Sequence, residues 1–329
     1  MDKQEIVALL RKDMVGEHQA IIQYLFHAYV LGEGELACEI EGIAREEMRH
    51  LDWLADAITG LGGDPSMDRD PVDFTLTTVA ELMTKDVGLE QGAVDQYRAH
   101  IEEIDDPGIQ RLLSRILADE LVHHGQFSEY AEEFADDAEM AAKIANVNAE
   151  ATGPGERTGE ILNQGIRHEY TVVLQYLYHS FMAKGKEEFE ELQNTAINEM
   201  QHLGWLAEAM ASRGGHPDMS HGPLFLSSDM EANLEADIAV EQEVTRDYTA
   251  QMPELDDPDL QSLVERIRDH EIYHDTTFKE LLAEVREEAA AAAEAGEAAQ
   301  SETPATGEAP DRESPAPPAL GSLLGRTQD

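Results

Sequence analysis

The spacing Glu-x-x-His occurs four times in this 329-residue chain, at matching places in its two halves. On an α-helix, residues three positions apart lie on the same side, about one turn from each other. Each pair can therefore present a carboxylate oxygen and an imidazole nitrogen to one metal ion. An acidic chain contains some such pairs by chance, but their recurrence in both halves favours a function. The pairs are Glu47/His50, Glu120/His123, Glu199/His202 and Glu271/His274.

The two halves are related by a tandem duplication. The segment Glu-Met-x-His-Leu-x-Trp-Leu begins at Glu47 and again 152 positions later at Glu199. The segment Asp-Asp-Pro that ends at Pro107 recurs at an offset of 151, ending at Pro258. The register thus slips by a single residue between these segments. A repeat of this length indicates two copies of one folded unit.

Apolar residues at helical spacing predict four long helices in the first half: 2–31, 35–58, 76–104, and one that starts at Pro107 and continues into the 130s or 140s. The connection between the second and third helices is longer than the 2–8 residues typical of neighbouring helices in a bundle. This pattern suits a four-helix bundle with one crossover connection. We therefore predict an all-α fold of two tandem four-helix bundles with a disordered C-terminal tail.

The predicted domain boundaries follow from composition. The first bundle covers residues 1–149, a linker 150–157, and the second bundle 158–286. Residues 287–319 contain no Leu, Ile, Val, Met or aromatic residue and form an acidic, Ala/Pro-rich linker that cannot bury a core, although its first Ala/Glu portion can extend the last helix. Residues 320–329 are set apart because leucines return there.

The charge of the chain excludes two classes of partner. It has 69 acidic and 23 basic residues, a formal net charge of −46, which repels nucleic acid and anionic membranes. Acid spread over both halves is typical of proteins from salt-accumulating halophiles; the alternative is an acidic mesophilic protein kept soluble by its charge. No apolar stretch is long enough to span a membrane and no basic-then-apolar signal begins the chain, so we expect a cytoplasmic protein. The single cysteine, Cys38, excludes a disulfide framework and a thiolate-rich metal site, and we expect it to be a small packing residue.

Each half also offers the further carboxylates that a dinuclear site needs. Helices one and three carry Glu17 and Glu90, aligned to Glu169 and Glu241, and each of these is followed by a tyrosine seven residues later: Tyr24, Tyr97, Tyr176 and Tyr248. Four carboxylates buried together would raise one another's pKa, whereas two divalent ions bring four positive charges against four negative ones. Oxygen ligands with one imidazole per ion suit iron or manganese.

This pattern resembles the bacterioferritin branch of the ferritin-like superfamily, twice, over nearly all of residues 1–285. The resemblance implies two ferritin-like bundles, each with a di-iron ferroxidase centre. It carries over to the metal ligands Glu17, Glu47, His50, Glu90, Glu120 and His123, and then to Glu169, Glu199, His202, Glu241, Glu271 and His274. It extends to Tyr24 and Tyr176, for which electron donation or ligand orientation is an alternative to plain core packing. The family also binds haem through a methionine directly after the second-helix glutamate. Met48 and Met200 hold that position here, with core filling as the alternative role.

The chain departs from that family in its architecture. Bacterioferritin subunits are single domains that build a hollow shell, whereas this chain is a fusion with an acidic tail. The end of the tail, Leu320–Arg326, contains Gly-Ser-Leu-Leu-Gly and resembles the C-terminal loading peptides of encapsulin cargo proteins. The resemblance implies docking to an encapsulin shell protein, and thus a place inside a nanocompartment. Known encapsulated ferritins carry half a site per chain, which differs from the two complete sites expected here. A homo-oligomer is left open.

The predicted function is oxidation of Fe(II) to Fe(III) with O2 or H2O2, for iron storage or detoxification, as encapsulin cargo. Glu47 and Glu120 would bridge the two ions of the first bundle, as Glu199 and Glu271 would in the second. Two alternatives stay open. A dimanganese catalase uses nearly the same ligands, and spacing does not distinguish iron from manganese. A non-catalytic iron-binding cargo protein would bind metal without turnover.

Overall fold

The computed structural model describes residues 1–135, 141–142, 144–145 and 153–301, and the side chains of this set up to residue 294. Its long elements are all α-helices, with one short 3-10 helix, and no strand occurs in these residues. The first half contains α1 (Lys3–Leu31), α2 (Glu35–Gly60), α3 (Val79–Glu103) and α4 (Pro107–Glu133). The second half contains α6 (Glu156–Met182), α7 (Lys186–Ser212), α8 (Met230–Gln251), η2 (Met252–Glu254) and α9 (Pro258–Ser301).

The helix boundaries follow from local capping chemistry. Asp2 caps α1 and Thr78 caps α3, each in a capping box with a glutamate three residues later. Asp106 accepts from the first backbone N–H groups of α4, and Pro107 occupies the first turn, where its missing N–H costs nothing. The helices predicted from the sequence are thus confirmed to within about three residues, which is the usual uncertainty of helix ends.

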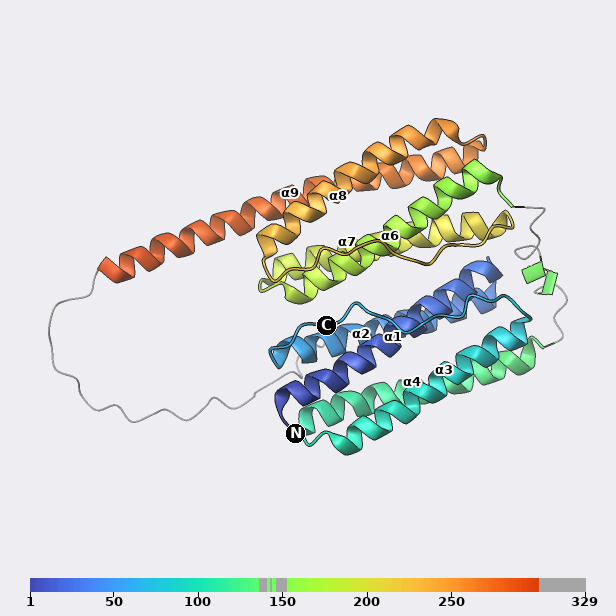
Figure 1. Ribbon diagram of the computed structural model, residues 1–329, viewed down its shortest axis with the longest axis horizontal. Coiled ribbons are helices and arrows are strands. Elements are labelled where there is room, and N and C mark those ends of the chain that lie inside the picture. Colours follow the sequence, from blue (N-terminus) through green and yellow to red (C-terminus); the bar gives the residue numbers. More distant parts are fainter. Residues whose placement is uncertain (136–140, 143, 146–152, 302–329) are drawn as a thin grey trace, which may run out of the picture. The chain divides into compact units, whose positions relative to one another are not determined.

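The first four helices form an antiparallel four-helix bundle, and the same arrangement repeats with α6 to α9 (Figure 1). In the first bundle α1 packs along α2, and α3 packs along α4. Residues 61–78 cross between these pairs as an extended connection, and residues 213–229 do the same in the second bundle. The side chain of Gln23 fixes the first crossover by donating to Asp73 O and accepting from Asp73 N, at 2.9 and 3.0 Å. The aligned Gln175 accepts from Phe225 N at 2.9 Å.

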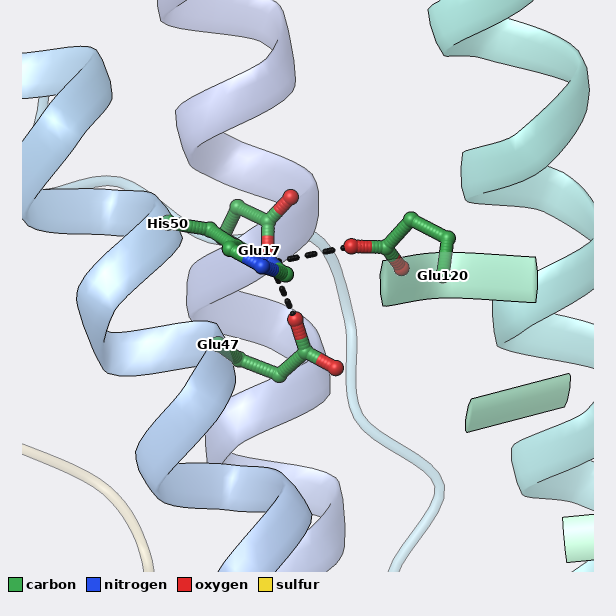
Figure 2. A group of neighbouring side chains, drawn as sticks. All are labelled: Glu17, Glu47, His50 and Glu120. Carbon is green, nitrogen blue, oxygen red and sulfur yellow. Dashed lines mark hydrogen bonds and ion pairs between the residues drawn. The ribbon is translucent and has the colours of Figure 1, made fainter. Parts of the chain in front are cut away.

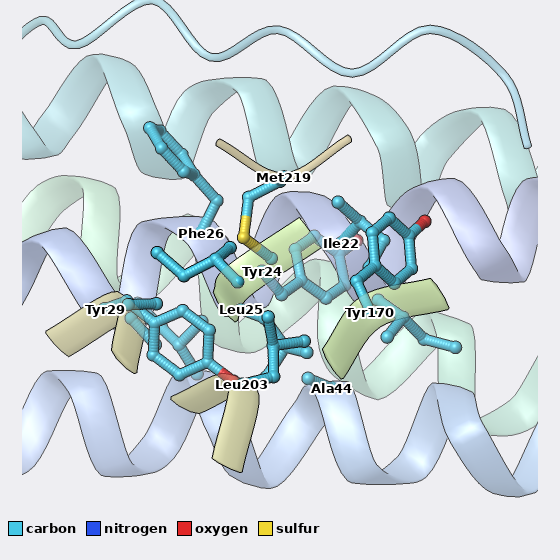
Figure 3. Packing of buried hydrophobic residues seen from close by; sticks show 14 of the residues in the cluster. Ile22, Tyr24, Leu25, Phe26, Tyr29, Ala44, Tyr170, Leu203 and Met219 are labelled. Atoms are coloured by element: carbon cyan, nitrogen blue, oxygen red, sulfur yellow. The ribbon is translucent and has the colours of Figure 1, made fainter. Parts of the chain in front are cut away.

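The two bundles share a hydrophobic core. Residues 1–286 form one compact unit, and one cluster of buried side chains runs through both bundles (Figure 3). Tyr29 of α1, Tyr170 of α6 and Leu203 of α7 are members of this cluster. Tyr29 lies so close to α7 that a Cβ added at Gly204 would come within 3.3 Å of its hydroxyl. The bundles are therefore packed on each other through α1, α2, α6 and α7.

A buried polar contact joins the bundles at positions that the duplication makes equivalent. His18 and Tyr170 are 152 residues apart, and His18 Nε2 lies 2.6 Å from the Tyr170 hydroxyl. Arg69 of the first crossover donates to the same hydroxyl at 3.1 Å and to Met219 O of the second crossover at 3.1 Å. Burial and the loss of water hold the pKa of His18 down, to about 3, so its imidazole is neutral at pH 7.

Three sequence-based expectations have definite outcomes here. Cys38 is exposed on α2, so the prediction that it is a packing residue was wrong: it follows the buried Ala37 and points away from the core. The helix α9 continues through the Ala/Glu-rich segment to Ser301, as strong helix formers favour. None of the described helices is both long and apolar enough to cross a membrane. The predicted docking peptide Leu320–Arg326 lies outside the described residues.

The substitution Tyr170→Phe should destabilise the folded chain by about 1–3 kcal/mol, because it leaves His18 Nε2 buried without a partner. Denaturant unfolding at pH 7 measures this loss. Tyr273→Phe is the matched control, since Tyr273 is 68% exposed and should change the free energy of unfolding by less than about 0.5 kcal/mol. Equal unfolding midpoints for both variants would show that the polar contact does not stabilise the bundle interface.

Candidate metal centres

Twelve side chains meet in two clusters, one inside each bundle. They are the twelve metal ligands predicted from the sequence, and every one of them is buried. Within each cluster they form two overlapping groups of four, and the ligand atoms of a group all lie within 4.8 Å of one another. Figure 2 shows one group, in which Glu47, His50 and Glu120 converge beside Glu17. We call the cluster in the first bundle the first centre and that in the second bundle the second centre.

Two carboxylates of each centre belong to both of its groups. In the first centre these are Glu47 and Glu120, and in the second they are Glu199 and Glu271. His50 Nδ1 lies 2.8 Å from Glu47 and 2.9 Å from Glu120, and His123 Nδ1 lies 2.8 Å from Glu47. The other two carboxylates of each centre each belong to a single group, and we call them the terminal glutamates: Glu17 and Glu90 in the first centre, Glu169 and Glu241 in the second. Each centre could thus hold two ions, with the two shared carboxylates available to both ions and one further glutamate and one histidine available to each.

The chemistry of the donor set fits divalent cations. Most of the buried side-chain atoms that lack a hydrogen-bond partner in the described residues belong to these two centres. They include both carboxylate oxygens of Glu199 and of Glu271, and Nδ1 of His123, His202 and His274, which meet carboxylates only as ion pairs without hydrogen-bond geometry. Buried polar atoms without partners are costly and call for an explanation. A pair of cations in each centre would satisfy these atoms and balance four carboxylates.

The acid–base state of the metal-free centres follows from burial and mutual repulsion. Burial, together with the charges of Glu120 and Glu47, raises the pKa of Glu17 well above its usual value. Burial and the same two carboxylates raise the pKa of Glu90 well above its usual value as well. Burial opposes charging of His123, yet its contacts with Glu47 raise its pKa to about 9. Glu17 and Glu90 therefore hold their protons more strongly than exposed glutamates do, and His123 holds its proton more strongly than an exposed histidine does.

Four tyrosines orient the terminal glutamates across the bundle. Tyr24 of α1 donates to Glu90 of α3 at 2.5 Å, and Tyr97 of α3 donates to Glu17 of α1. Tyr176 and Tyr248 make the same crossed contacts with Glu241 and Glu169 in the second centre. Each tyrosine therefore holds the glutamate of the opposite helix, and not the one seven residues before it in sequence. This contact favours a ligand-orienting role for Tyr24 and Tyr176.

A buried histidine–aspartate pair beside each centre was missed in the sequence. His27 Nδ1 lies 2.8 Å from Asp86, and His179 Nδ1 lies 2.8 Å from Asp237, with all four side chains fully buried. The sequence did contain a signal for these pairs. Each aspartate lies four residues, or one helical turn, before a ligand, Glu90 or Glu241, and this spacing recurs in both halves. These pairs link α1 to α3 and α6 to α8 one turn from the ligands.

A cavity of about 220 Å³ leads to the first centre between α1 and α3. It reaches Glu17 and Glu120 and is also lined by the exposed Asp70 and by Asp13, which pairs with the buried His100 at 2.7 Å. Its remaining wall includes the small residues Gly16, Ala20, Gly88, Gly92 and Ala93. A small divalent cation is the kind of solute that such an opening admits.

The two methionines predicted to hold haem follow the ligands Glu47 and Glu199 on α2 and α7. Met48 is partly buried and packs against the shared core, and Met200 is likewise neither fully buried nor exposed. Both are therefore on the flanks of their helices, away from the fully buried ligand face. Haem binding between them stays a prediction.

Comparison with known proteins finds one family model that matches each bundle. The family model described as the ferritin-like domain matches residues 7–136 and again residues 159–287. The bacterioferritin of Desulfovibrio desulfuricans is 30% identical over 127 residues, which cover 37% of this chain and 71% of that protein. Bacterioferritin of Mycobacterium tuberculosis is 29% identical over 125 residues, 36% of this chain and 79% of that protein. A solved structure of the Desulfovibrio desulfuricans protein, described by its di-iron site, aligns with a TM-score of 0.40 and 28% identity over 43% of this chain and 87% of that one.

Replacing the terminal glutamates of α3 and α8, Glu90→Gln with Glu241→Gln, should stabilise the metal-free protein at pH 7. Because the folded-state pKa values of both groups are raised, the metal-free protein loses stability as pH rises above the unfolded value of about 4.5, and glutamine removes that loss. We expect the melting temperature of the metal-free variant to rise by a few degrees, and its further rise on adding Mn²⁺ to shrink.

The matched control for this pair is Glu102→Gln, an exposed glutamate on the same helix as Glu90. It should leave both the metal-free melting temperature and the response to Mn²⁺ unchanged. A metal-free double variant that melts below the native protein would show that the buried carboxylates are not destabilising.

Proposed function

Because the chain belongs to the ferritin-like family, whose domain it contains twice, we propose that it is a ferroxidase that oxidises Fe(II) to Fe(III) with O2 or H2O2. The observation that carries the proposal is the pair of shared carboxylates in each centre, Glu47 with Glu120 and Glu199 with Glu271. Shared carboxylates hold two ions close together, and two Fe(II) ions can together supply two electrons. The two electrons and two protons convert O2 to H2O2, or H2O2 to two molecules of water.

The protein's own residues would bind the iron ions, orient the ligands and balance the charge. Each iron would be held by one terminal glutamate and one histidine, and the tyrosines fix the terminal glutamates by hydrogen bonds. Four carboxylates in each centre balance the four positive charges of two Fe(II) ions. The acidic cavity between α1 and α3 would supply Fe(II) to the first centre.

The biological setting we propose is iron storage or detoxification in the cytoplasm, inside an encapsulin nanocompartment. Support comes from the sequence of Leu320–Arg326, an apolar segment at the end of an acidic tail poor in apolar residues. A short apolar segment on a long polar linker can reach and fill a groove on a shell's inner wall. Haem at Met48 and Met200 and assembly into a homo-oligomer are further proposals that accompany this setting.

The ferroxidase proposal predicts fast oxidation of about four Fe(II) per chain when O2 is added to protein loaded without oxygen, since each centre offers two ligand groups. Near-ultraviolet absorbance follows the reaction. The double substitution Glu47→Ala with Glu199→Ala removes one bridging carboxylate from each centre and should reduce the rate to that of iron in buffer. Glu35→Ala with Glu187→Ala changes exposed glutamates at the start of the same helices and should leave the rate unchanged.

Two results would contradict the ferroxidase. Oxidation no faster than in buffer, together with tightly held manganese and release of O2 from H2O2, would identify a dimanganese catalase. Tight Fe(II) binding without oxygen-dependent turnover would identify an iron-binding cargo protein.

The docking proposal predicts that removal of residues 320–329 abolishes co-purification with an encapsulin shell protein produced in the same cells. Removal of residues 302–311 shortens the tail by the same length and should preserve co-purification. Ferroxidase activity should be equal in both variants, because the two centres lie in residues 1–286. Retained co-purification without residues 320–329 would place the docking segment elsewhere.

A further inference from the structure

The outward nitrogens of the ligating histidines have different partners in the two bundles. In both centres the histidines turn Nδ1 toward the carboxylates. In the first bundle the opposite nitrogens face acids: His50 Nε2 lies 3.4 Å from Asp119, and His123 Nε2 lies 2.8 Å from Glu46. If Nδ1 bound a cation, Nε2 would carry the ring proton and donate a hydrogen bond to the facing carboxylate.

In the second bundle, no carboxylate of the described residues is the hydrogen-bond partner of His202 Nε2 or His274 Nε2. His202 Nε2 lies 2.9 Å from Nδ1 of His270, a second imidazole. Asn198 occupies the position of Glu46, and its side-chain amide donates to Asn194 O at 2.9 Å. His274 Nε2 therefore has no charged acceptor there comparable with Glu46.

These differences lie at aligned positions. Asp119 corresponds to His270 at the offset of 151, and Glu46 corresponds to Asn198 at the offset of 152. The twelve ligands themselves are the same residue types in both halves. The two copies have thus kept their ligands and changed both acceptors behind the histidines.

The hydrogen-bond acceptor of Nε2 changes how strongly Nδ1 of the same histidine binds a metal ion. A carboxylate draws on the Nε2 proton and makes Nδ1 a better electron donor to a cation, and loss of such a partner costs about 10- to 100-fold in metal affinity. A neutral imidazole is a weaker acceptor than a carboxylate. Arg115 also pairs with Asp119, and Arg49 pairs with the partly exposed Glu46, which reduces the free charge of both carboxylates. We therefore expect a difference toward the lower end of that range.

Residues at the cavity of the first centre also differ from their counterparts in the second bundle, which bears on how readily each centre fills. Small residues leave space at the mouth of the cavity of the first centre, where a Cβ added at Gly88 or Gly92 would meet nothing within 4 Å. The second bundle has larger residues at the aligned positions. The pairs are Gly16 with His168, Gly88 with Ala239, and Gly92 with Glu243.

We propose that the two centres are inequivalent: the first centre binds divalent cations more tightly and fills first, and the second centre is a weaker site. Asp119 and Glu46 are the positioning residues that make the difference, through the imidazoles of His50 and His123. The inference rests on the proposed dinuclear metal sites, but not on turnover by either of them.

Anaerobic calorimetric titration of the full-length, metal-free protein with Co²⁺ tests the inequivalence. We expect two classes of site, two ions in each, with affinities that differ by about 10-fold or more. Glu47→Ala should remove the tighter class and Glu199→Ala the weaker one, which assigns each class to a bundle. A single class of four ions, or loss of the weaker class in Glu47→Ala, would overturn the proposal.

Reciprocal exchanges test the named residues. Glu46→Asn with Asp119→His should lower the affinity of the tighter class to that of the weaker one. Asn198→Glu with His270→Asp should raise the weaker class toward the tighter one, so that a folding defect cannot explain both results. Circular dichroism confirms that each variant is helical. Exchanges that leave both affinities unchanged would remove these residues as the cause and overturn the proposal.

The same titration separates this inference from the proposed function. Two classes of Co²⁺ site in a protein that does not oxidise Fe(II) would support inequivalence and contradict the ferroxidase. A single class of Co²⁺ site in a protein that oxidises Fe(II) would support the ferroxidase and contradict inequivalence. Absence of Co²⁺ binding would contradict both.

Discussion

Mutual repulsion among four buried carboxylates is the constraint on which each bundle depends. One comes from each of four helices, so the helices that form the core also carry its least favourable charges. The surroundings are built to hold them: imidazoles share the interior of the cluster, and the tyrosines donate to the terminal glutamates. The paired His27 and Asp86 stand one turn away and keep α1 and α3 in register. Such an interior is preorganised for cations, because the donors are in place before any ion binds.

The duplication places two such interiors in a single compact unit. The bundles share a continuous core, yet every ligand of a centre comes from its own bundle. A change around one centre therefore leaves the ligands of the other intact. His18 and Tyr170 descend from one position and now form a contact between the bundles, which neither copy could make with itself. The positions around the ligands have diverged in the same manner, as the pairs Glu46/Asn198 and Asp119/His270 show.

Periodicity and spacing determined much of this protein. The start of α4 was predicted at Pro107 because the Asp106–Pro107 pair acts locally, whereas α3 begins at Val79, three residues after the predicted start, because Thr78 caps it there. The ligand set could be named because a helix puts Glu47 and His50 on one side, whatever packs against it. Repetition supplied the rest, since Glu17 and Glu90 stand out only when their counterparts recur in the second half. The exposure of Cys38 was predicted wrongly, because a short side chain beside a buried alanine gives no periodic signal.

Only the tertiary structure decided which groups meet across helices. The pairing of Tyr24 with Glu90, and not with Glu17 on its own helix, depends on how α1 and α3 cross. The hydrogen-bond partners of His50 Nε2 and His123 Nε2 could not be predicted from the sequence either, because nothing in the sequence distinguishes Asp119 and Glu46 from the many surface acids of this chain. Side-chain spacing along one helix is a local property that the sequence fixes. Contacts between helices depend on packing of the whole core, so the ligands followed from the sequence and their surroundings from the fold.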